Sequence, residues 1–369
     1  MRHRHAVHAA AAMLVLAASP VLAQSGATRV DTSFAGLVAA LSEPGGYFDS
    51  DNLISNETSY LHVMTRLDQL GVKGGAYVGV GPDQNYSYLA AIRPQVAYMM
   101  DIRRDNALQH LLFRALFARS RTRVEYLARW LGRRVPADLE AWRQRPILDL
   151  LAWVDSTAID ASSAERERRE TLRVVESFGV PLDARDRETI LRFHQQFMRE
   201  GLELRFSSFN RSGAGYPTLR RLILERDLAG AMRSYLVREA DWQFVRDLHA
   251  AGRIVPVVGD LAGTHALAAI GRDVRARGLA ISALYTSNAE MYVWRGGGFP
   301  AFAATVMRLP TNPDGVIIRS FFDRSGVGHR LGVRGHVSVQ LLQRFTDFAA
   351  LQRRGAFRTY EDLITLGAR

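Results

Sequence analysis

Short apolar segments alternate with amphipathic segments over much of the chain, which is the pattern of a layered α/β fold. Strands are expected over residues 76–80, 95–102, 253–261, 278–288 and 315–322. These segments are almost continuously apolar, as in strands that are buried on both faces of a parallel sheet. Helices are expected over residues 33–41, 57–70, 86–92, 105–117, 264–277, 296–309 and 337–351. We therefore predict an α/β protein with a doubly wound, mostly parallel sheet.

Residues 118–250 interrupt this alternation with a helix-rich and arginine-rich stretch that holds few strand candidates. From Arg114 to Arg145, nine arginines stand against three acids. We interpret 118–250 as a large helical insertion or cap between the second and third core strands. It belongs to one domain that covers residues 24–369.

The N-terminal residues 1–23 have the three parts of a secretory signal. Arg2 and Arg4 precede a short apolar run, and small or apolar residues stand before the expected cleavage after Ala23. The run is shorter than the roughly 20 residues of a spanning helix, and no other stretch is long enough. We therefore expect an exported, periplasmic protein without a transmembrane segment. An uncleaved anchor or a wrongly assigned start is the alternative.

The composition narrows the possible chemistry. The chain has no cysteine, which excludes disulfides, thiol catalysis and cysteine-bound zinc. Its formal charge of +11 comes almost entirely from arginine. A basic chain can bind anionic lipid, nucleic acid or an acidic ligand, but a generally basic surface is the simpler interpretation. No aromatic-interleaved motif accompanies the arginines, so no specific nucleic-acid partner is expected.

The turn after the first expected strand has features of a site for an adenosine-containing ligand. Gly79 and Gly81 let the backbone approach a ligand, and Asp101 ends the next strand, 20 positions after Gly81. Gln84 occupies the third glycine position of a dinucleotide motif. Asp83 would repel a pyrophosphate at the start of the helix, which favours a sulfonium cofactor without phosphate. The structural alternative is that these residues form only a turn with a well-capped helix and an acid at a strand end.

Polar residues also follow the later strands. Asp260 comes after the third strand, where an acid can bind an adenine amino group, and Ser287 and Asn288 follow the fourth. Because the carboxyl ends of parallel strands meet at one edge, these residues are expected near Asp83, Asn85 and Asp101. The structural alternatives are that Asp260 caps the following helix and that Ser287 and Asn288 shape a turn.

The chain resembles the class I S-adenosylmethionine-dependent methyltransferases, and more narrowly an uncharacterised bacterial family with a methyltransferase-like Rossmann fold. The blocks that carry the resemblance are "EPGGYFDSDNLISNE", "GGAYVGVGPDQNYSYLAAIRP", "DIRRDN" and "YTSNAEMY". The resemblance implies a cofactor site made of Gly79, Gly81, Asp83, Asn85, Asp101, Ile102, Asp260 and Leu261. It places Ser287, Asn288, Glu290 and Tyr292 in the loop that faces the substrate. The chain departs from the pattern at Tyr77, where an acid is usual, and in its helical block.

This resemblance implies an S-adenosylmethionine-dependent methyltransferase-like protein that acts on a small molecule. The alternative is an exported non-catalytic or small-molecule-binding protein that reuses the fold, because the sulfonium donor is made in the cytosol. No catalytic residue is predicted.

Three further sets of residues give weaker signals. No histidine pair has H-x-x-x-H or H-E-x-x-H spacing, so no metal site is predicted. The acids Glu43, Asp49, Asp51 and Glu57 match no calcium loop and are expected to cover the cleft or cap helices. Arg103 and Arg104 are interpreted as a solvated pair rather than as contacts to an anionic ligand.

Overall fold

The computed structural model describes residues 33–208, 216–322 and 328–368. These residues belong to the compact unit Thr32–Arg369. The predicted signal sequence, 1–23, lies outside the described residues, so it stays a prediction. Within the described ranges, no helix is long and apolar enough to cross a membrane.

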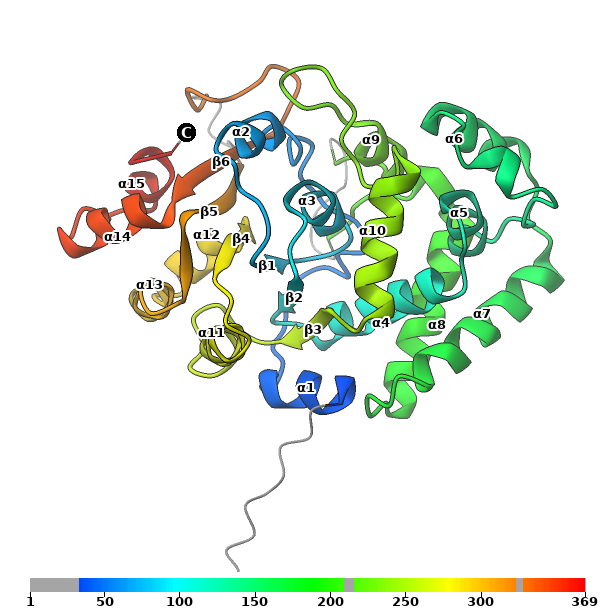
Figure 1. Cartoon of the computed structure of the whole chain (residues 1–369), viewed down its shortest axis with the longest axis horizontal. Coiled ribbons are helices and arrows are strands. Elements are labelled where there is room, and N and C mark those ends of the chain that lie inside the picture. Colours follow the sequence, from blue (N-terminus) through cyan, green and yellow to red (C-terminus); the bar gives the residue numbers. More distant parts are fainter. Residues whose placement is uncertain (1–32, 209–215, 323–327, 369) are drawn as a thin grey trace, which may run out of the picture. The chain divides into compact units, whose positions relative to one another are not determined.

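A six-stranded sheet forms the centre of the fold (Figure 1). Its strands are β1 (Ala76–Val80), β2 (Val96–Asp101), β3 (Ile254–Val258), β4 (Ile281–Ser287), β5 (Thr311–Phe322) and β6 (Ser338–Arg344). Their order across the sheet is β3-β2-β1-β4-β5-β6. The pairs among β1 to β5 are parallel, and β6 pairs antiparallel with β5. The predicted mostly parallel α/β sheet is confirmed.

The sequence prediction was wrong near the C-terminus. Residues 337–351 were expected to form one helix, but the segment divides into β6 and α14 (Phe345–Arg353). Apolar residues at Val339, Leu342, Phe345 and Phe348 recur every three positions, which imitates a helical face. Pairing with the long strand β5 overrides this local pattern from Ser338 to Arg344. The expected helix over 57–70 is also shorter, because turns occupy 58–63 before α2 (Met64–Gln69).

Helices cover both faces of the sheet, as a doubly wound fold requires. One face packs against α3 (Asn85–Ile92), α4 (Arg104–Ala118) and α10 (Glu239–Ala250) in a large apolar core. The other face packs against α1 (Phe34–Leu41), α11 (Ala266–Ala276), α13 (Phe299–Val306) and α14 in a second core. α15 (Tyr360–Thr365) adds Leu363 to this second core. Each strand therefore buries alternate residues in different cores.

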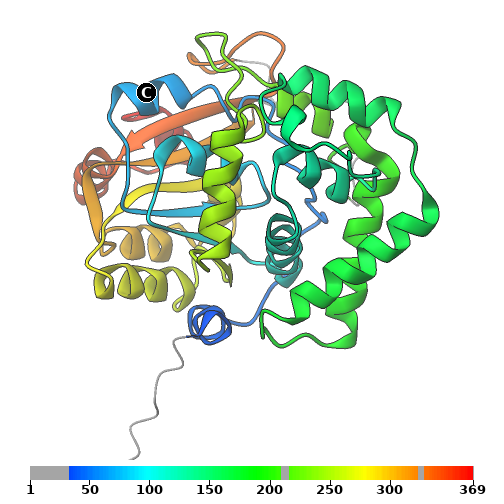
Figure 2. The same ribbon diagram turned by 45° about the vertical axis from the view of Figure 1, so that its right-hand side comes forward.

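A helical segment connects β2 to β3 and gathers on one side of the sheet (Figure 2). Between α4 and α10 it contains α5 (Arg123–Trp130), α6 (Ile147–Ser156), α7 (Ala161–Glu176), α8 (Ala184–Glu200) and α9 (Leu219–Leu224). α4 contacts β2 and β3, α10 packs against α3 and α4, and α7 and α8 pack against α4. Aromatic side chains such as Phe117, Tyr126 and Trp242 stack between these helices. The segment therefore shares the core of the sheet.

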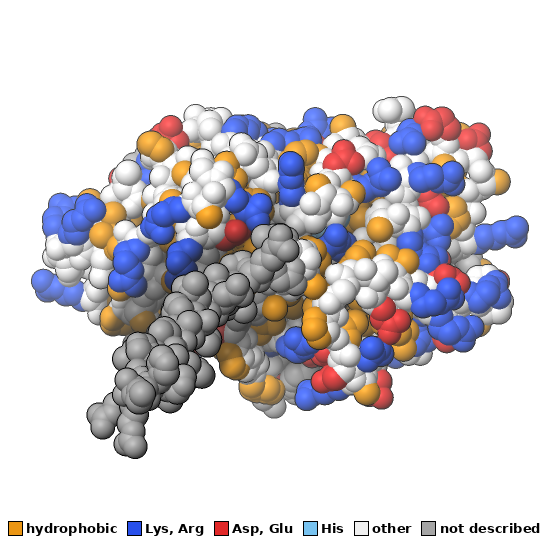
Figure 3. Space-filling model, turned by 60° about the horizontal axis from the view of Figure 1, so that its bottom comes forward, with side chains coloured by type: hydrophobic (Ala, Val, Ile, Leu, Met, Phe, Trp, Pro, Cys, Tyr) orange, Lys and Arg blue, Asp and Glu red, His pale blue; other side chains and the backbone are white. Residues whose placement is uncertain are grey.

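Many arginines of this segment interact with other side chains or backbone carbonyls of the protein. Arg119 and Arg129 both pair with Glu167, and Arg123 pairs with Glu239 while donating to backbone carbonyls. Arg114 lies over the rings of Phe34 and Phe178. Figure 3 shows Lys and Arg side chains spread over the visible face with Asp and Glu among them. Some of these arginines thus serve packing between helices, and others lie on a surface of mixed charge.

Candidate functional site

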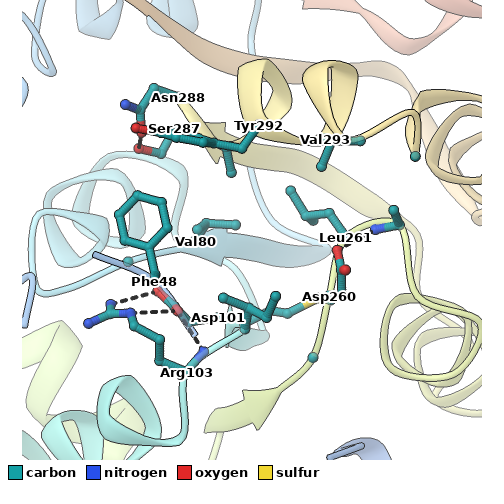
Figure 4. A pocket seen from close by; sticks show the side chains of 18 of the residues that line it. Phe48, Val80, Asp101, Arg103, Asp260, Leu261, Ser287, Asn288, Tyr292 and Val293 are labelled. Carbon is teal, nitrogen blue, oxygen red and sulfur yellow. Dashed lines mark hydrogen bonds and ion pairs between the residues drawn. The ribbon is translucent and has the colours of Figure 1, made fainter. Parts of the chain in front are cut away.

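The strand order reverses beside β1, because the chain continues from β1 to β2 and β3 and then returns to β4 on the other side of β1. Such a switch point leaves a crevice outside the carboxyl ends of the strands, where open α/β sheets bind ligands. A cavity of about 340 Å³ lies there (Figure 4). It is lined by Tyr47, Phe48, Asn52, Val80, Gly81, Met100, Asp101, Ile102, Arg103, Gly259, Asp260, Leu261, Ala262, Ser287, Asn288, Ala289, Tyr292, Val293, Gly296 and Gly298.

The structure brings eight of the twelve predicted site residues together in this cavity. They are Gly81, Asp101, Ile102, Asp260, Leu261, Ser287, Asn288 and Tyr292. Seven of them come from the ends of β1, β2, β3 and β4, as the parallel arrangement predicts, and Tyr292 comes from the helix that follows β4. The other four, Gly79, Asp83, Asn85 and Glu290, are not among the residues that line the cavity.

Asp101 is held by Arg103 from the same turn. The backbone N–H and Nε of Arg103 donate to Oδ1 of Asp101 at 2.9 and 3.1 Å, and Nη2 donates to Oδ2 at 3.0 Å. Both side chains are buried. The remaining Nη1 of Arg103 donates to the carbonyls of Ser50 and Asp51. Arg103 therefore fixes the orientation of Asp101 and also fastens the segment before Asn52, which is a different role from the solvated pair expected from the sequence.

His110 of α4 supports the glycine turn after β1 through a hydrogen bond. Gly81 has φ +89°, a conformation that side chains with a Cβ rarely adopt. Its carbonyl lies 2.9 Å from Nε2 of His110, and Tyr86 Oη lies 2.8 Å from Nδ1. Because a carbonyl only accepts, Nε2 carries the proton and Nδ1 accepts from Tyr86. Burial lowers the pKa of His110 to about 4, which keeps this neutral tautomer at pH 7.

Gly79 and Asn85 serve the packing of this turn. A Cβ on Gly79 would lie 1.9 Å from Oδ1 of Asn85, so a larger residue does not fit there. Asn85 accepts from the Tyr77 hydroxyl at 2.7 Å and donates to the carbonyl of Pro82 at 2.8 Å. Tyr77, which stands in place of the usual acid, therefore anchors the turn through Asn85.

Asp83 is directed toward the helical segment. The hydroxyl of Tyr235 donates to its Oδ2 at 3.2 Å, and Tyr235 in turn lies 3.3 Å from the Tyr126 hydroxyl. Burial raises the pKa of Asp83 to about 7. Asp83 lies outside the cavity lining and is bound by Tyr235, so it does not supply the negative charge in the cavity that the sequence analysis assigned to it.

Asp260 lines the part of the cavity that follows β3. Its Oδ1 accepts from the backbone N–H of Ala262 at 2.9 Å, which shapes the turn after β3. Glu43 accepts from the backbone N–H of Asp260 at 2.9 Å and so joins this turn to the N-terminal segment. Among the described residues, Asp260 forms no ion pair, and it lines the cavity. Asp260 therefore both shapes the turn after β3 and lines the cavity.

Ser287 ends β4 with φ +55°, an uncommon value for a residue other than glycine. Its hydroxyl donates to Glu57, whose carboxylate also accepts from Tyr285 at 2.5 Å. Burial raises the pKa of Glu57 despite these hydrogen bonds. Such backbone strain persists where the surroundings enforce it, and it often occurs at functional sites. A buried carboxyl group therefore orients the hydroxyl on this wall.

The "TSNAEMY" segment after β4 was expected to be a polar loop, but most of it begins α12 (Ala289–Arg295). This helix turns Tyr292 and Val293 toward the cavity (Figure 4). Glu290 is not among the residues that line it. Glu290 is 1% exposed and binds Arg319 of β5 through both oxygens, at 2.5 and 3.2 Å. Glu290 therefore lies in an interior ion pair.

The segment 42–52 forms the outer wall. It crosses the ends of β3 and β2, where the N–H of Glu43 donates to Val258 and that of Gly46 donates to Ile102. Phe48 projects into the cavity and meets Tyr292 edge to face, with 5.0 Å between ring centroids. The expectation that this acidic loop covers the cleft agrees with this geometry. Tyr47, Phe48 and Asn52 were missed as lining residues, because nothing in the local pattern indicates which loop side chains face inward.

These features define an α/β protein with a doubly wound sheet and a ligand-sized cavity at its switch point, consistent with the methyltransferase-like fold inferred from the sequence. A family model described as "Domain of unknown function (DUF7790)" matches residues 53–144 and 183–365, and the chain belongs to this family. No curated protein matches the chain. Among solved structures, it is similar to the rRNA methyltransferase aviRa from Streptomyces viridochromogenes, with 14% identity and a TM-score of 0.31. That match covers 86% of this chain and 99% of the other. A likeness at this level says nothing about what the chain binds.

The position of Glu290 predicts a structural effect of its removal. Glu290→Ala leaves the guanidinium of Arg319 buried without its carboxylate, so we expect a loss of about 3–5 kcal/mol in the free energy of unfolding. Urea denaturation followed by circular dichroism measures this loss. Asp314→Ala is the control, because it breaks the exposed Asp314–Arg344 pair on the neighbouring strands. The control should cost less than about 1 kcal/mol. Equal losses in the two variants would contradict the assignment.

Asp83 predicts a pH-dependent stability. An unfolded aspartate has a pKa of about 3.9, whereas burial raises that of Asp83 to about 7 in the fold. The folded chain therefore binds this proton more tightly. The resulting stability is fully present below about pH 4 and is lost as the pH rises through about 7. Asp83→Asn stays neutral throughout, so we expect it to be more stable than the unmutated chain at pH 8 by on the order of 3–4 kcal/mol.

Urea denaturation of both chains at pH 5 and pH 8 tests this expectation. The advantage of Asp83→Asn should shrink strongly at pH 5, where Asp83 itself is largely protonated. Glu188→Gln, which changes an exposed acid of α8, should show no such difference. An advantage of Asp83→Asn that is the same at both pH values would contradict the raised pKa.

Proposed function

We propose that the chain binds S-adenosylmethionine in the switch-point cavity and is a methyltransferase-like protein for a small molecule. The observation that carries this proposal is the meeting of Gly81, Asp101 and Asp260 with Ser287 and Asn288 around one cavity. In a doubly wound fold, these positions are the ones that approach an adenosine-containing ligand. The weak likeness to a solved methyltransferase has no part in this argument.

The chemistry of the lining supports an adenosine moiety. Oδ2 of Asp101 accepts one hydrogen bond from Arg103, and a carboxylate oxygen has room for a second. Asp101 can thus accept from a ribose hydroxyl while it remains paired. Ile102 and Leu261 provide apolar contact for a planar base, and Asp260 provides an acceptor for its amino group. The volume of about 340 Å³ is at the small end of the range for ligand pockets.

A sulfonium cation would meet a mixed electrostatic environment. Arg103 compensates the charge of Asp101, so Asp260 is the acid of the lining that attracts a cation. The aromatic rings of Phe48 and Tyr292, which line the cavity, would add cation–π attraction. This arrangement replaces the sequence argument based on Asp83, which points elsewhere.

Methyl transfer needs alignment of donor and acceptor and exclusion of water more than it needs a catalytic base. Ser287, Asn288 and Tyr292 line the wall opposite Asp101, and we propose that this wall contacts the acceptor (Figure 4). Glu57 holds the Ser287 hydroxyl in place, and Phe48 closes the cavity from outside. When bound, the cofactor would supply the methyl group.

A non-catalytic small-molecule-binding protein is the second candidate. One observation favours it: both oxygens of Asp101 already accept from Arg103. If that pair fills the position of the ribose, the cavity would hold a smaller ligand. The predicted export also separates the chain from the cytosolic donor.

Calorimetric titration with S-adenosylmethionine and S-adenosylhomocysteine tests the proposal. We expect saturable binding of both by the unmutated chain. Asp260→Ala and Asn288→Ala should each weaken binding by at least about tenfold, equivalent to about 1.4 kcal/mol, because each removes a polar group of the lining. Asp101→Asn should also weaken binding while keeping the shape of the side chain.

Glu188→Ala is the matched control, since Glu188 is an exposed acid on α8 far along the chain from every lining residue. It should bind like the unmutated chain. Circular dichroism confirms that each variant is folded. Failure of the folded, unmutated chain to bind either compound would reject the proposal, and unchanged binding by Asp260→Ala and Asp101→Asn would place the ligand elsewhere.

A further inference from the structure

Three side chains from distant parts of the sequence converge outside the switch-point cavity. His62 lies just before α2, Glu225 follows α9, and His336 lies in the connection before β6. Figure 1 shows this connection, in orange, on the same side of the fold as α2 and α9. One nitrogen of each histidine and one carboxylate oxygen lie within 4.8 Å of one another.

The separations in this cluster suit a shared metal ion better than direct hydrogen bonds. Nε2 of His62 and Nε2 of His336 lie 3.6 and 4.0 Å from the same oxygen, Oε1 of Glu225. A charge-assisted hydrogen bond is about 2.7–2.9 Å long. Donor atoms on a tetrahedral zinc ion with bonds of about 2.0–2.1 Å are separated by roughly 3.3–3.4 Å. A small movement of the side chains would give that spacing.

The environment also suits a metal. The three side chains are only 9%, 11% and 15% exposed, in the order His62, Glu225, His336. The two imidazole rings meet edge to face with centroids 4.5 Å apart, where two protonated rings would repel each other. A neutral imidazole is the form that binds metals, and both rings here are largely shielded from solvent. Arg221 is a nearby cation whose charge acts on His336 and opposes the binding of a metal ion.

We propose that His62, Glu225 and His336 form a zinc site with three protein ligands and a fourth position open to water. Two imidazoles and one carboxylate are a ligand set that zinc accepts, whereas magnesium and calcium prefer oxygen ligands alone. The sequence motifs gave no sign of this site, because its ligands are separated by more than 100 residues. The site is distinct from the switch-point cavity and does not depend on the function proposed for that cavity.

The location indicates what a bound ion would do. The segment 57–62 begins at Glu57, which holds Ser287, and ends at His62. Along its length, Ser59 also bonds to Ser338 at the start of β6. A metal ion would join this segment to the end of α9 and to the connection before β6. It would therefore stabilise the segment that supports one wall of the cavity.

Measuring the zinc content of the full chain tests this site, provided that other histidines able to bind metal are first removed. His3, His5 and His8 near the N-terminus can bind metal by themselves, so they are replaced by alanine in every sample. After incubation with zinc and removal of the free ion, we expect roughly one zinc per chain. Cobalt as a substitute should give the strong visible absorption of a tetrahedral site. Magnesium should not compete.

Three variants test whether the zinc is bound by these three side chains. His62→Ala/His336→Ala should lose the bound zinc and the cobalt absorption. Glu225→Gln, which keeps the size of the side chain, should weaken zinc binding by at least about tenfold. His265→Ala, on the other side of the sheet beside α1, should bind zinc like the parent chain. Zinc should raise the melting temperature of the parent and of His265→Ala but not that of the double variant.

The proposal is overturned if the parent chain retains no zinc, or if Glu225→Gln and the double variant bind as tightly as the parent. Should the double variant fail to fold, the Glu225→Gln affinity decides. These outcomes leave the test of S-adenosylmethionine binding unaffected.

Discussion

The pair of Asp101 and Arg103 is the interaction on which the site depends. Parallel strands bring the ends of β1 to β4 to one edge, but they do not by themselves fix a wall across that edge. Arg103 does so, because one guanidinium binds the carboxylate of Asp101 and the carbonyls of Ser50 and Asp51. The sheet, the predicted ligand-binding acid and the covering segment are thus joined by a single buried side chain.

The walls of the cavity are supported by polar groups behind them, of which His110 and Glu57 are buried and Glu43 is half-buried. His110 holds the Gly81 turn, Glu57 holds Ser287, and Glu43 holds the turn at Asp260. A buried polar group that lacks a partner is costly, so each of these contacts restricts the conformation of the backbone that it supports. The cavity is therefore largely formed before any ligand arrives, which is the usual condition of small-molecule sites.

The sequence pattern predicted the strands well because buried parallel strands are almost continuously apolar. It failed at β6, where a spacing of three between apolar residues imitated a helix and pairing with β5 prevailed. It placed Asp101 and Asp260 at the cavity because the ends of parallel strands must meet. It gave no warning that Asp83 and Glu290 turn away from it, since Tyr235 and Arg319, which bind them, are remote in sequence.

By itself, the sequence determined the order of strands and helices as far as β5, the glycine turn after β1 and the acids at the strand ends. These properties follow from hydrophobic periodicity and from the local conformations that glycine permits. The tertiary structure decided which side chains face the cavity, which charges are paired and that His62, Glu225 and His336 meet. The reason is physical: the direction and partner of a side chain depend on packing between segments that are far apart in the chain.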